Sequence, residues 1–198
     1  MADNYLEKKF EEYAAAKAGK RPARRLSPSG HRQGVVELRF PRRRVMVALR
    51  EPLTVAEAFA GAGCQVAFCG TDAGLQATAE RIGAQFHLVE QADVESLGAA
   101  MDKAFRTWRD IEILISDADN AAKLSARWSE LRGRLPMAPD YGHMIVVGQA
   151  DASLPEVAHA TVNRIVGKSN ATATATTCLF LSLPDSEAID GQTIEIKG

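Results

Sequence analysis

Cysteine and histidine are scarce and scattered in this sequence. Three cysteines, Cys64, Cys69 and Cys178, occur in 198 residues, so they cannot all pair, and no two of them form a Cys-x-x-Cys motif. A disulfide framework is therefore excluded, and the apolar neighbours of all three predict buried free thiols in a reducing cytoplasm. The four histidines are far apart, at His31, His87, His143 and His159. This spacing predicts no metal site.

Long apolar runs are also absent. No stretch approaches the roughly 18–20 residues that a membrane-spanning helix needs. The first residues lack the apolar core of a signal peptide. We therefore expect a soluble protein without a membrane segment, and 198 residues suit one domain with or without an appendage.

The charges are divided unevenly between two parts of the chain. Residues 1–44 carry a net charge of +7 and residues 45–198 a net charge of −8, which gives −1 overall. A basic arm on an acidic body can lie on its own body, on a sister subunit or on a polyanion. Because the complementary charge is already present in the chain, we favour the first two and do not expect nucleic acid as a partner.

The arm itself has three parts. Residues 5–18 have helical spacing of aromatic side chains, residues 19–34 form a linker rich in Arg, Pro, Ser and Gly, and residues 35–40 alternate like a short strand. We therefore divide the chain into an N-terminal arm, residues 1–43, and a main domain, residues 44–198.

In the main domain, short apolar runs alternate with amphipathic segments. The expected strands are residues 44–49, 64–70, 85–90, 111–116, 143–148, 159–165 and 192–197, and the expected helices are residues 54–63, 75–84, 93–108, 123–135 and 171–181. This alternation predicts an α/β fold, a Rossmann-like, doubly wound, mostly parallel sheet with helices on both faces. The strand order should reverse between the first and fourth strands. In the longest helix Asp93 is the expected N-cap, and the apolar stripe is expected to be core, at Leu97, Met101, Ala104, Phe105 and Trp108.

Glycine is missing where a dinucleotide-binding fold needs it most. In such folds a glycine-rich turn after the first strand lets the backbone approach the pyrophosphate, which lies on a helix N-terminus. Residues 48–54 contain no glycine, whereas Glu51 adds a negative charge and Pro52 removes an N–H donor. Arg50 or Thr54 could meet a phosphate, but we expect a solvated Arg50 and an N-cap at Thr54.

Several motifs resemble those of the short-chain dehydrogenase/reductase (SDR) family. AEAFAGAGCQVAFC is similar to its first helix and second strand, and residues 164–198, with CLFL and a closing QTI strand, are similar to its C-terminal segment. The resemblance implies positions for cofactor contacts at Asp72 near the adenosine ribose, Glu90 near the adenine and Ser116 at the start of the two-Asn motif. For Asp72 we prefer a helix cap, and Asp117 and Asp119 are interpreted as altered Asn positions or acidic residues of a surface turn.

The family's catalytic Ser, Tyr and Lys have no counterpart in register. Ser153 follows the fifth strand out of register, and only a short turn at residues 154–157 replaces the helix that would carry Tyr and Lys. Tyr13 and Lys17 match the Tyr-x-x-x-Lys spacing but precede the first strand. We therefore assign no catalytic residue and interpret Tyr13 as a docking aromatic.

These departures give two functional hypotheses. The first is a degenerate SDR-like protein that is non-catalytic (a pseudoenzyme), has no cofactor and acts as a binding or assembly partner. The alternative is an atypical NAD(P)-dependent oxidoreductase whose NAD or NADP site is completed by a partner chain. In both cases we expect a homo-oligomer, or a hetero-oligomer with an intact SDR relative.

Overall fold

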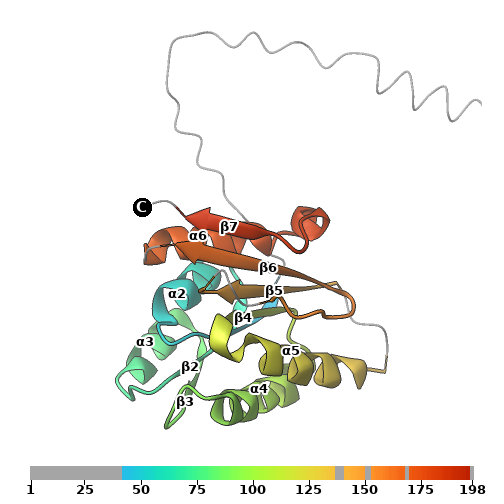
Figure 1. Cartoon of the computed structure of the whole chain (residues 1–198). Coiled ribbons are helices and arrows are strands. Elements are labelled where there is room, and N and C mark those ends of the chain that lie inside the picture. The colour runs from blue at the N-terminus through green and yellow to red at the C-terminus, as the bar shows by residue number, and fades with distance from the viewer. Residues whose placement is uncertain (1–41, 137–140, 150–152, 168–169, 197–198) are drawn as a thin grey trace, which may run out of the picture. The chain divides into compact units, whose positions relative to one another are not determined.

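The core of the protein is a seven-stranded sheet in which every strand pairing is parallel (Figure 1). The computed structural model describes residues 42–136, 141–149, 153–167 and 170–196. The strands are β1 (Arg44–Ala48), β2 (Gln65–Gly70), β3 (Gln85–Leu88), β4 (Ile113–Asp117), β5 (Gly142–Val147), β6 (Ala160–Gly167) and β7 (Thr193–Ile196). Their order, β3-β2-β1-β4-β5-β6-β7, reverses direction between β1 and β4. The predicted fold class and switch point are confirmed.

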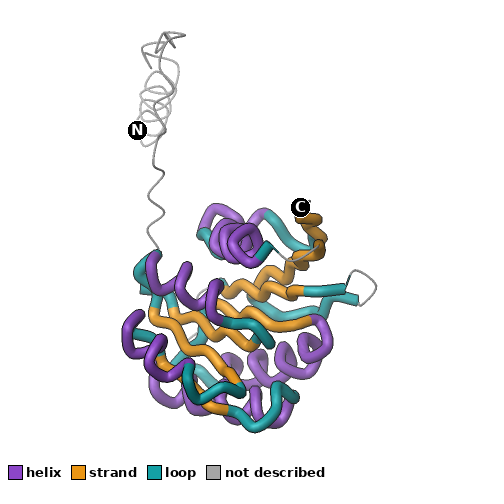
Figure 2. Tube along the Cα trace, turned by 90° about the vertical axis from the view of Figure 1, so that its left-hand side faces the viewer, coloured by secondary structure: helices purple, strands orange, loops and turns teal. Residues whose placement is uncertain are grey.

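Helices cover both faces of this sheet (Figure 2). Helices α2 (Leu53–Gly61), α3 (Leu75–Ile82) and α6 (Ala171–Leu181) bury one face, and α4 (Val94–Trp108) and α5 (Ala118–Gly133) bury the other. A short 3-10 helix, η1 (Pro184–Ala188), precedes β7. A sheet covered on both faces needs apolar side chains on both sides of its central strands, and β1 supplies them at the four consecutive residues 45–48.

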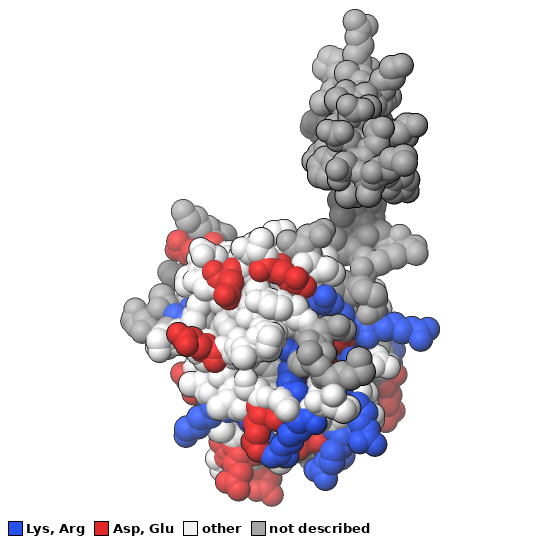
Figure 3. Space-filling view, turned by 90° about the vertical axis from the view of Figure 1, so that its right-hand side faces the viewer, with Lys and Arg blue, Asp and Glu red and all other residues white. Residues whose placement is uncertain are grey.

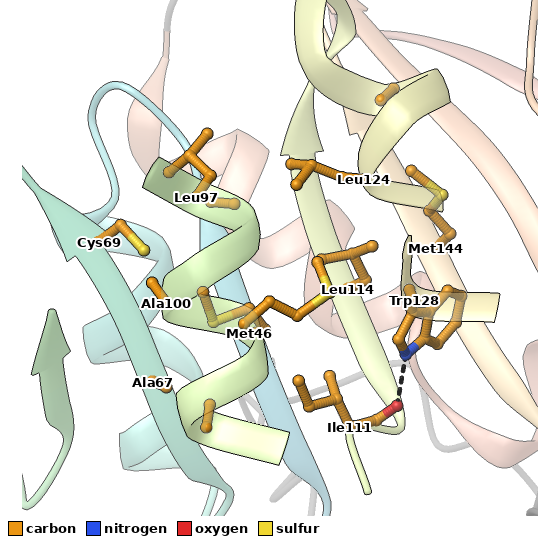
Figure 4. Packing of buried hydrophobic residues seen from close by; sticks show 14 of the residues in the cluster. Met46, Ala67, Cys69, Leu97, Ala100, Ile111, Leu114, Leu124, Trp128 and Met144 are labelled. Atoms are coloured by element: carbon orange, nitrogen blue, oxygen red, sulfur yellow. Dashed lines mark hydrogen bonds between the residues drawn. The ribbon is translucent and has the colours of Figure 1, made fainter. Parts of the chain in front are cut away.

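The core on the α4 and α5 face includes two methionines of the sheet and one indole (Figure 4). Met46 from β1 and Met144 from β5 are fully buried there. Trp128 of α5 is equally buried, and its Nε1–H donates a 2.7 Å hydrogen bond to the carbonyl of Ile111. The indole therefore fills core volume without leaving its donor unsatisfied.

The long helix forms as its sequence predicts. Asp93 is the N-cap, and its carboxylate accepts the backbone N–H of Ser96 at 2.8 Å. The pKa of Asp93 lies below its usual value, mainly because of this hydrogen bond. The predicted stripe is confirmed as core: three of its residues are fully buried, and Phe105 and Trp108 pack partly buried against the same cluster.

Two helix starts differ from the prediction. Helix α2 begins at Leu53 after Pro52, so Thr54 lies inside the helix and is not its N-cap. Helix α5 begins at Ala118, well before the expected Lys123, because the acidic residues after β4 open a helix and not a surface turn. Asp117 occupies the N-cap position of α5, and Asp119 lies in its first turn.

The segment after β5 lacks a helix among its described residues, 153–159, as predicted from its shortness. Leu154 and Val157 are partly buried and pack against the cluster that α4 and α5 cover. They replace part of the cover that a helix would give to this face of the sheet.

The start of β1 and the residues just before β4 carry a charged cluster that is largely buried. Arg132 of α5 is 3.2 Å from Asp110 and lies over the Trp128 ring, 5.1 Å from its centroid. Arg44 pairs with Glu112 at 3.0 Å. Each buried charge thus has an oppositely charged neighbour, as burial requires.

Several predictions fall outside the described residues, including the helix at residues 5–18, Tyr13, Lys17 and the strand at residues 35–40. Within the described ranges, no helix is both long enough and apolar enough to cross a membrane.

Candidate functional site

The natural place for a ligand in this fold is the crevice where the strand order reverses, outside the carboxyl ends of β1 and β4. The two strands are direct neighbours, with Ala48 of β1 opposite Ser116 of β4. The residues that follow these two positions therefore meet at one edge of the sheet. They are Leu49 to Pro52 on one side and the first turn of α5 on the other.

A double contact from Arg50 spans this crevice. The backbone N–H of Arg50 donates a 2.8 Å hydrogen bond to Oδ2 of Asp117, and its guanidinium pairs with the Asp119 carboxylate. Asp117 does not cap its own helix, since its side chain accepts no hydrogen bond from the first turn of α5. The Asp117 carboxylate accepts instead from the loop after β1, and this hydrogen bond joins that loop to the start of α5.

The charges at this point disfavour an anionic ligand. Asp117 is half-buried, and its pKa is raised, mainly because burial removes the carboxylate from water. The contact with Arg50 lowers this pKa, and the negative charges of Asp119 and Glu51 raise it. Three carboxylates therefore lie near one guanidinium that is already engaged. A diphosphate placed here would meet net negative charge.

The helix that should receive the phosphates is also altered. Pro52 is buried at the N-cap position of α2 and makes no side-chain cap. As a proline it lacks an N–H that a phosphate oxygen could accept from. The glycines that allow close approach of the backbone are missing from residues 48–54.

The hollow left at the ends of β1, β2 and β3 is small. It has a volume of about 120 Å³ and is lined by residues that include Arg50, Gly70, Thr71 and Val89. Pockets for drug-sized ligands and cofactors usually measure about 300–1,000 Å³. With its charges and missing glycines, this site does not fit NAD or NADP, and we derive no hydride-transfer step through either.

The three candidate cofactor residues do not converge on a common site. Asp72 is exposed, and its Oδ1 accepts the backbone N–H of Gly74 at 2.8 Å. Gly74 is the N-cap of α3, so Asp72 orders the turn just before the helix and does not occupy the cap position itself. Ser116 is fully buried, and its hydroxyl donates to the carbonyl of Asp117 at 3.0 Å. Glu90 is exposed and lines a groove outside β3.

A second hollow, of about 410 Å³, lies at the carboxyl ends of β5 and β6. Its walls are mostly apolar, with Gln149 and Thr174 as polar members. Gly167 there has a φ of +142°, and a Cβ at this residue would lie 2.3 Å from the carbonyl oxygen of Ile196. Glycine is thus required at the end of β6 by the close approach of β7.

Groups for acid–base chemistry are not gathered around this second hollow in the described residues. Ser153 is exposed and does not line the hollow. Tyr141 precedes β5 and so lies at the opposite end of that strand.

Two features of the main domain were missed from the sequence, the Arg50 bridge and the burial of His87. The bridge follows from the predicted neighbourhood of β1 and β4, whereas no sequence signal marked His87.

Comparison with solved structures identifies the fold. The chain is similar to a short-chain dehydrogenase from Burkholderia cenocepacia J2315 in complex with NADP, with 15% identity, a TM-score of 0.64, and coverage of 82% of this chain and 98% of the other. It is similar to a hydroxysteroid dehydrogenase from Escherichia coli, with 14% identity, a TM-score of 0.63, and coverage of 82% and 98%. A dehydrogenase/reductase from Sinorhizobium meliloti 1021 gives 13% identity, a TM-score of 0.61, and coverage of 81% and 95%.

No protein-family model matches the sequence, and no curated protein matches it. At these identities the structural similarity establishes the fold, which is that of the short-chain dehydrogenase/reductases. The resemblance predicted from the sequence motifs is confirmed at this level.

Proposed function

We propose that this chain is a degenerate, shortened short-chain dehydrogenase/reductase that no longer binds NAD(P) and acts as a binding or assembly partner. The observation that carries the proposal is the bridge from Arg50 to Asp117 and Asp119, which occupies the crevice where a dinucleotide would lie. The side chains at this crevice are arranged to bind one another and not a diphosphate.

The missing acid–base groups support the same proposal. Ketone reduction on this fold requires a proton donor beside the carbonyl and a residue that lowers the pKa of that donor. The segment that would carry both is reduced here to a short connection, whose residues Leu154 and Val157 serve packing.

Assembly would use the end of the sheet that is opposite β3. Strand β7 is the last strand there in the described sheet, and Phe180 on the adjacent helix α6 is 50% exposed. A large exposed apolar side chain and an end strand each suit contact with a second copy or with an intact relative. The net charge of +7 on residues 1–44 can add electrostatic attraction to the acidic body of a partner.

The mixed surface charges and the free cysteines are consistent with a protein-binding role in the cytoplasm. In Figure 3 basic and acidic side chains are both spread over the visible face, so this face offers no continuous basic patch for a nucleic acid. The three cysteines are free, and burial raises the pKa of each thiol to about 12, which makes them unreactive in a reducing compartment.

One observation favours an atypical oxidoreductase as the second candidate. The 410 Å³ hollow beside Gly148 and Gly167 lies at the carboxyl ends of the strands, where ligands bind in open α/β sheets. In that case a partner chain would complete the site.

A turnover assay separates the two candidates. The full chain is incubated with NADH or NADPH and a panel of ketones, and with NAD or NADP and a panel of alcohols. The proposal predicts no turnover above the rate without protein. Turnover that depends on Tyr13, and is lost in Tyr13→Phe, would establish the second candidate.

A further inference from the structure

A groove of about 790 Å³ runs along the outer edge of β3, away from the crevice between β1 and β4. Strand β3 is the end strand of the described sheet, and α3 and α4 flank it (Figure 1). Residues of α3, β3 and α4 all line the groove, so the strand edge forms its floor and the two helices form its walls. The groove therefore follows an open strand edge between two helices.

The backbone groups of two residues point into this edge. The N–H of Val89 donates a 3.0 Å hydrogen bond to the carbonyl of Gly70 in β2. The N–H and C=O of one residue point to the same side of a strand, and this side alternates from residue to residue. His87 and Val89 therefore direct their backbone groups to β2, and Phe86 and Leu88 direct theirs outward. Such outward groups are a template for pairing with another strand.

The sequence of β3 does not protect this edge. Edge strands are often blunted by lysine, by proline or by other charged side chains. The segment Gln85–Leu88 contains none of these, and Leu88 is 60% exposed. Strand β7, at the opposite end of the described sheet, carries Glu195. An exposed apolar side chain on an unprotected edge suits a docking site.

The two faces of β3 would select different residues of an added strand. Phe86 packs against the cluster that α3 covers, and Leu88 lies on the same side of the strand. His87 points to the α4 side, opposite Cys69, and is buried there. The side chains of an added strand would alternate in the same way. One set would lie beside Phe86 and Leu88, which favours apolar residues, and the other set would lie beside the exposed part of α4.

The α4 wall carries a positive charge. Lys103 is exposed, lines the groove and forms no ion pair within the described ranges. Helix α4 joins the parallel strands β3 and β4, so it runs back toward the start of β3, and Lys103 lies about 15 Å along it from the N-cap Asp93. Glu90 lines the groove at the other end, just after β3. An acidic residue of the added strand can therefore pair with Lys103 away from Glu90.

We propose that the edge of β3 binds an extended segment of a partner protein as an added strand. The segment places apolar residues beside Phe86 and Leu88 and an acidic residue beside Lys103. A second copy of this chain is a poorer occupant, because its own α3 and α4 would meet the two helical walls, whereas a single extended chain fits between them. This site is separate from the crevice and from β7, and it does not depend on the proposed loss of NAD(P) binding.

The test is a fluorescence anisotropy titration of a labelled, blocked heptapeptide, Val-Thr-Val-Glu-Val-Thr-Val, with the full chain. Two derivatives carry backbone N-methyl groups, one on the inner valines and one on the threonines and the glutamate. Only alternate N–H groups of an added strand face β3, so the proposal predicts saturable binding of the parent peptide and of one derivative, with binding of the other derivative lost.

Three outcomes of this titration would overturn the proposal. The first is an absence of saturable binding by the parent peptide. The second is an equal effect of the two sets of methyl groups, which would show that no strand ladder forms. The third is self-association of the full chain that Leu88→Asp abolishes, which would place a second copy at this edge.

Variants of the chain locate the peptide in the groove. Leu88→Asp should weaken binding by about tenfold, because it places a charge against the apolar residues of the peptide. Lys103→Met keeps the aliphatic stem and should weaken binding by about fivefold, but it should have no effect on a peptide with glutamine in place of glutamate. Lys123→Met, on an exposed lysine of α5 that does not line the groove, should leave binding unchanged. Unchanged binding by Leu88→Asp or Lys103→Met, with the variant folded by circular dichroism, would contradict the proposal.

Discussion

The backbone N–H of Arg50 and the Oδ2 atom of Asp117 lie 2.8 Å apart, across the point where the strand order of the sheet reverses. The bond joins the loop after β1 to the start of α5, two segments that are 67 residues apart in sequence. In this fold the same gap is the usual place for a ligand. The structure uses it for an internal contact.

The first prediction concerns this contact. Asp117→Ala should lower the free energy of unfolding by about 1 kcal/mol, because the Arg50 N–H loses its acceptor. Asp117→Asn keeps an oxygen that can accept the hydrogen bond. It also removes a carboxylate whose charged form is disfavoured by burial, so its free energy of unfolding should stay within about 0.5 kcal/mol of the wild type. Urea denaturation measures both. Equal losses in the two variants would show that the carboxylate charge, and not the hydrogen bond, holds the loop.

The second prediction concerns Gly142 at the start of β5. A Cβ there would lie 2.3 Å from Nη1 of Arg132 and 2.9 Å from the Trp128 ring. Arg132 cannot move away easily, because it is buried against Asp110. Gly142→Ala should therefore cost about 1–3 kcal/mol of unfolding free energy.

Gly98 provides the matched control for Gly142. It lies within α4, and a Cβ there would meet nothing within 4 Å. Gly98→Ala should stabilise the protein by up to about 1 kcal/mol through helix propensity. Thermal melts of both variants would test the packing of α5 on β5, and a neutral Gly142→Ala would refute it.

The third prediction is a loss of stability on mild acidification. His143 is fully buried, and its Nδ1 lies 3.0 Å from the Thr161 hydroxyl. Burial, followed by the charges of Arg43 and Arg132, lowers the pKa of His143 to about 4. The unfolded chain binds this proton near pH 6.5, so between about pH 6.5 and 4 it binds more protons than the folded state. Stability should therefore fall with decreasing pH in this window by roughly 1 kcal/mol per unit.

A variant isolates the contribution of His143. His143→Gln removes the titrating group and should flatten the pH dependence of the urea midpoint between pH 6.5 and 5, whatever its effect at pH 7. His87, whose pKa is also lowered, remains in this variant and should leave a smaller slope of the same sign. An unchanged slope would exclude His143 as the main cause.

The fourth prediction concerns assembly. If the full chain associates through α6 and β7, Phe180→Asp should produce monomers, because it places a charge at the centre of the contact. Leu88→Asp changes a residue that is 60% exposed at the opposite edge of the sheet, and it should leave the mass unchanged. Light scattering at low and high salt also tests the basic arm, whose attraction should be screened beyond about 8–10 Å. A monomeric full chain at high concentration, with no partner recovered, would remove support for this proposal.

The sequence predicts the sheet well because its physical signals are local and repeated. Parallel strands covered on both faces are mostly apolar on both sides, and the inner residues of β1, β2, β4 and β5 form such runs. The cap at Asp93 is predictable for the same reason, since its partner Ser96 is three residues away. These interactions need no knowledge of distant contacts.

The site is less predictable because its contacts join distant segments. Acidic residues such as Asp117 and Asp119 are typical of a surface turn, and the sequence around them does not predict that α5 begins there. Their partner is Arg50 in the loop after β1, which is far away in the sequence. The alternation in β3 does not reveal which side chain faces α4. The burial of His87 therefore depends on how α4 packs against the edge of the sheet.

Isothermal calorimetry of the full chain with NADH and with NADPH measures directly whether the crevice still binds a dinucleotide, with a cofactor-binding dehydrogenase as the positive control. We expect no saturable heat with either nucleotide, because Asp117, Asp119 and Glu51 place negative charge at the crevice and Arg50 is already paired there. Micromolar affinity for either nucleotide would contradict it and would show that a dinucleotide displaces the Arg50 bridge.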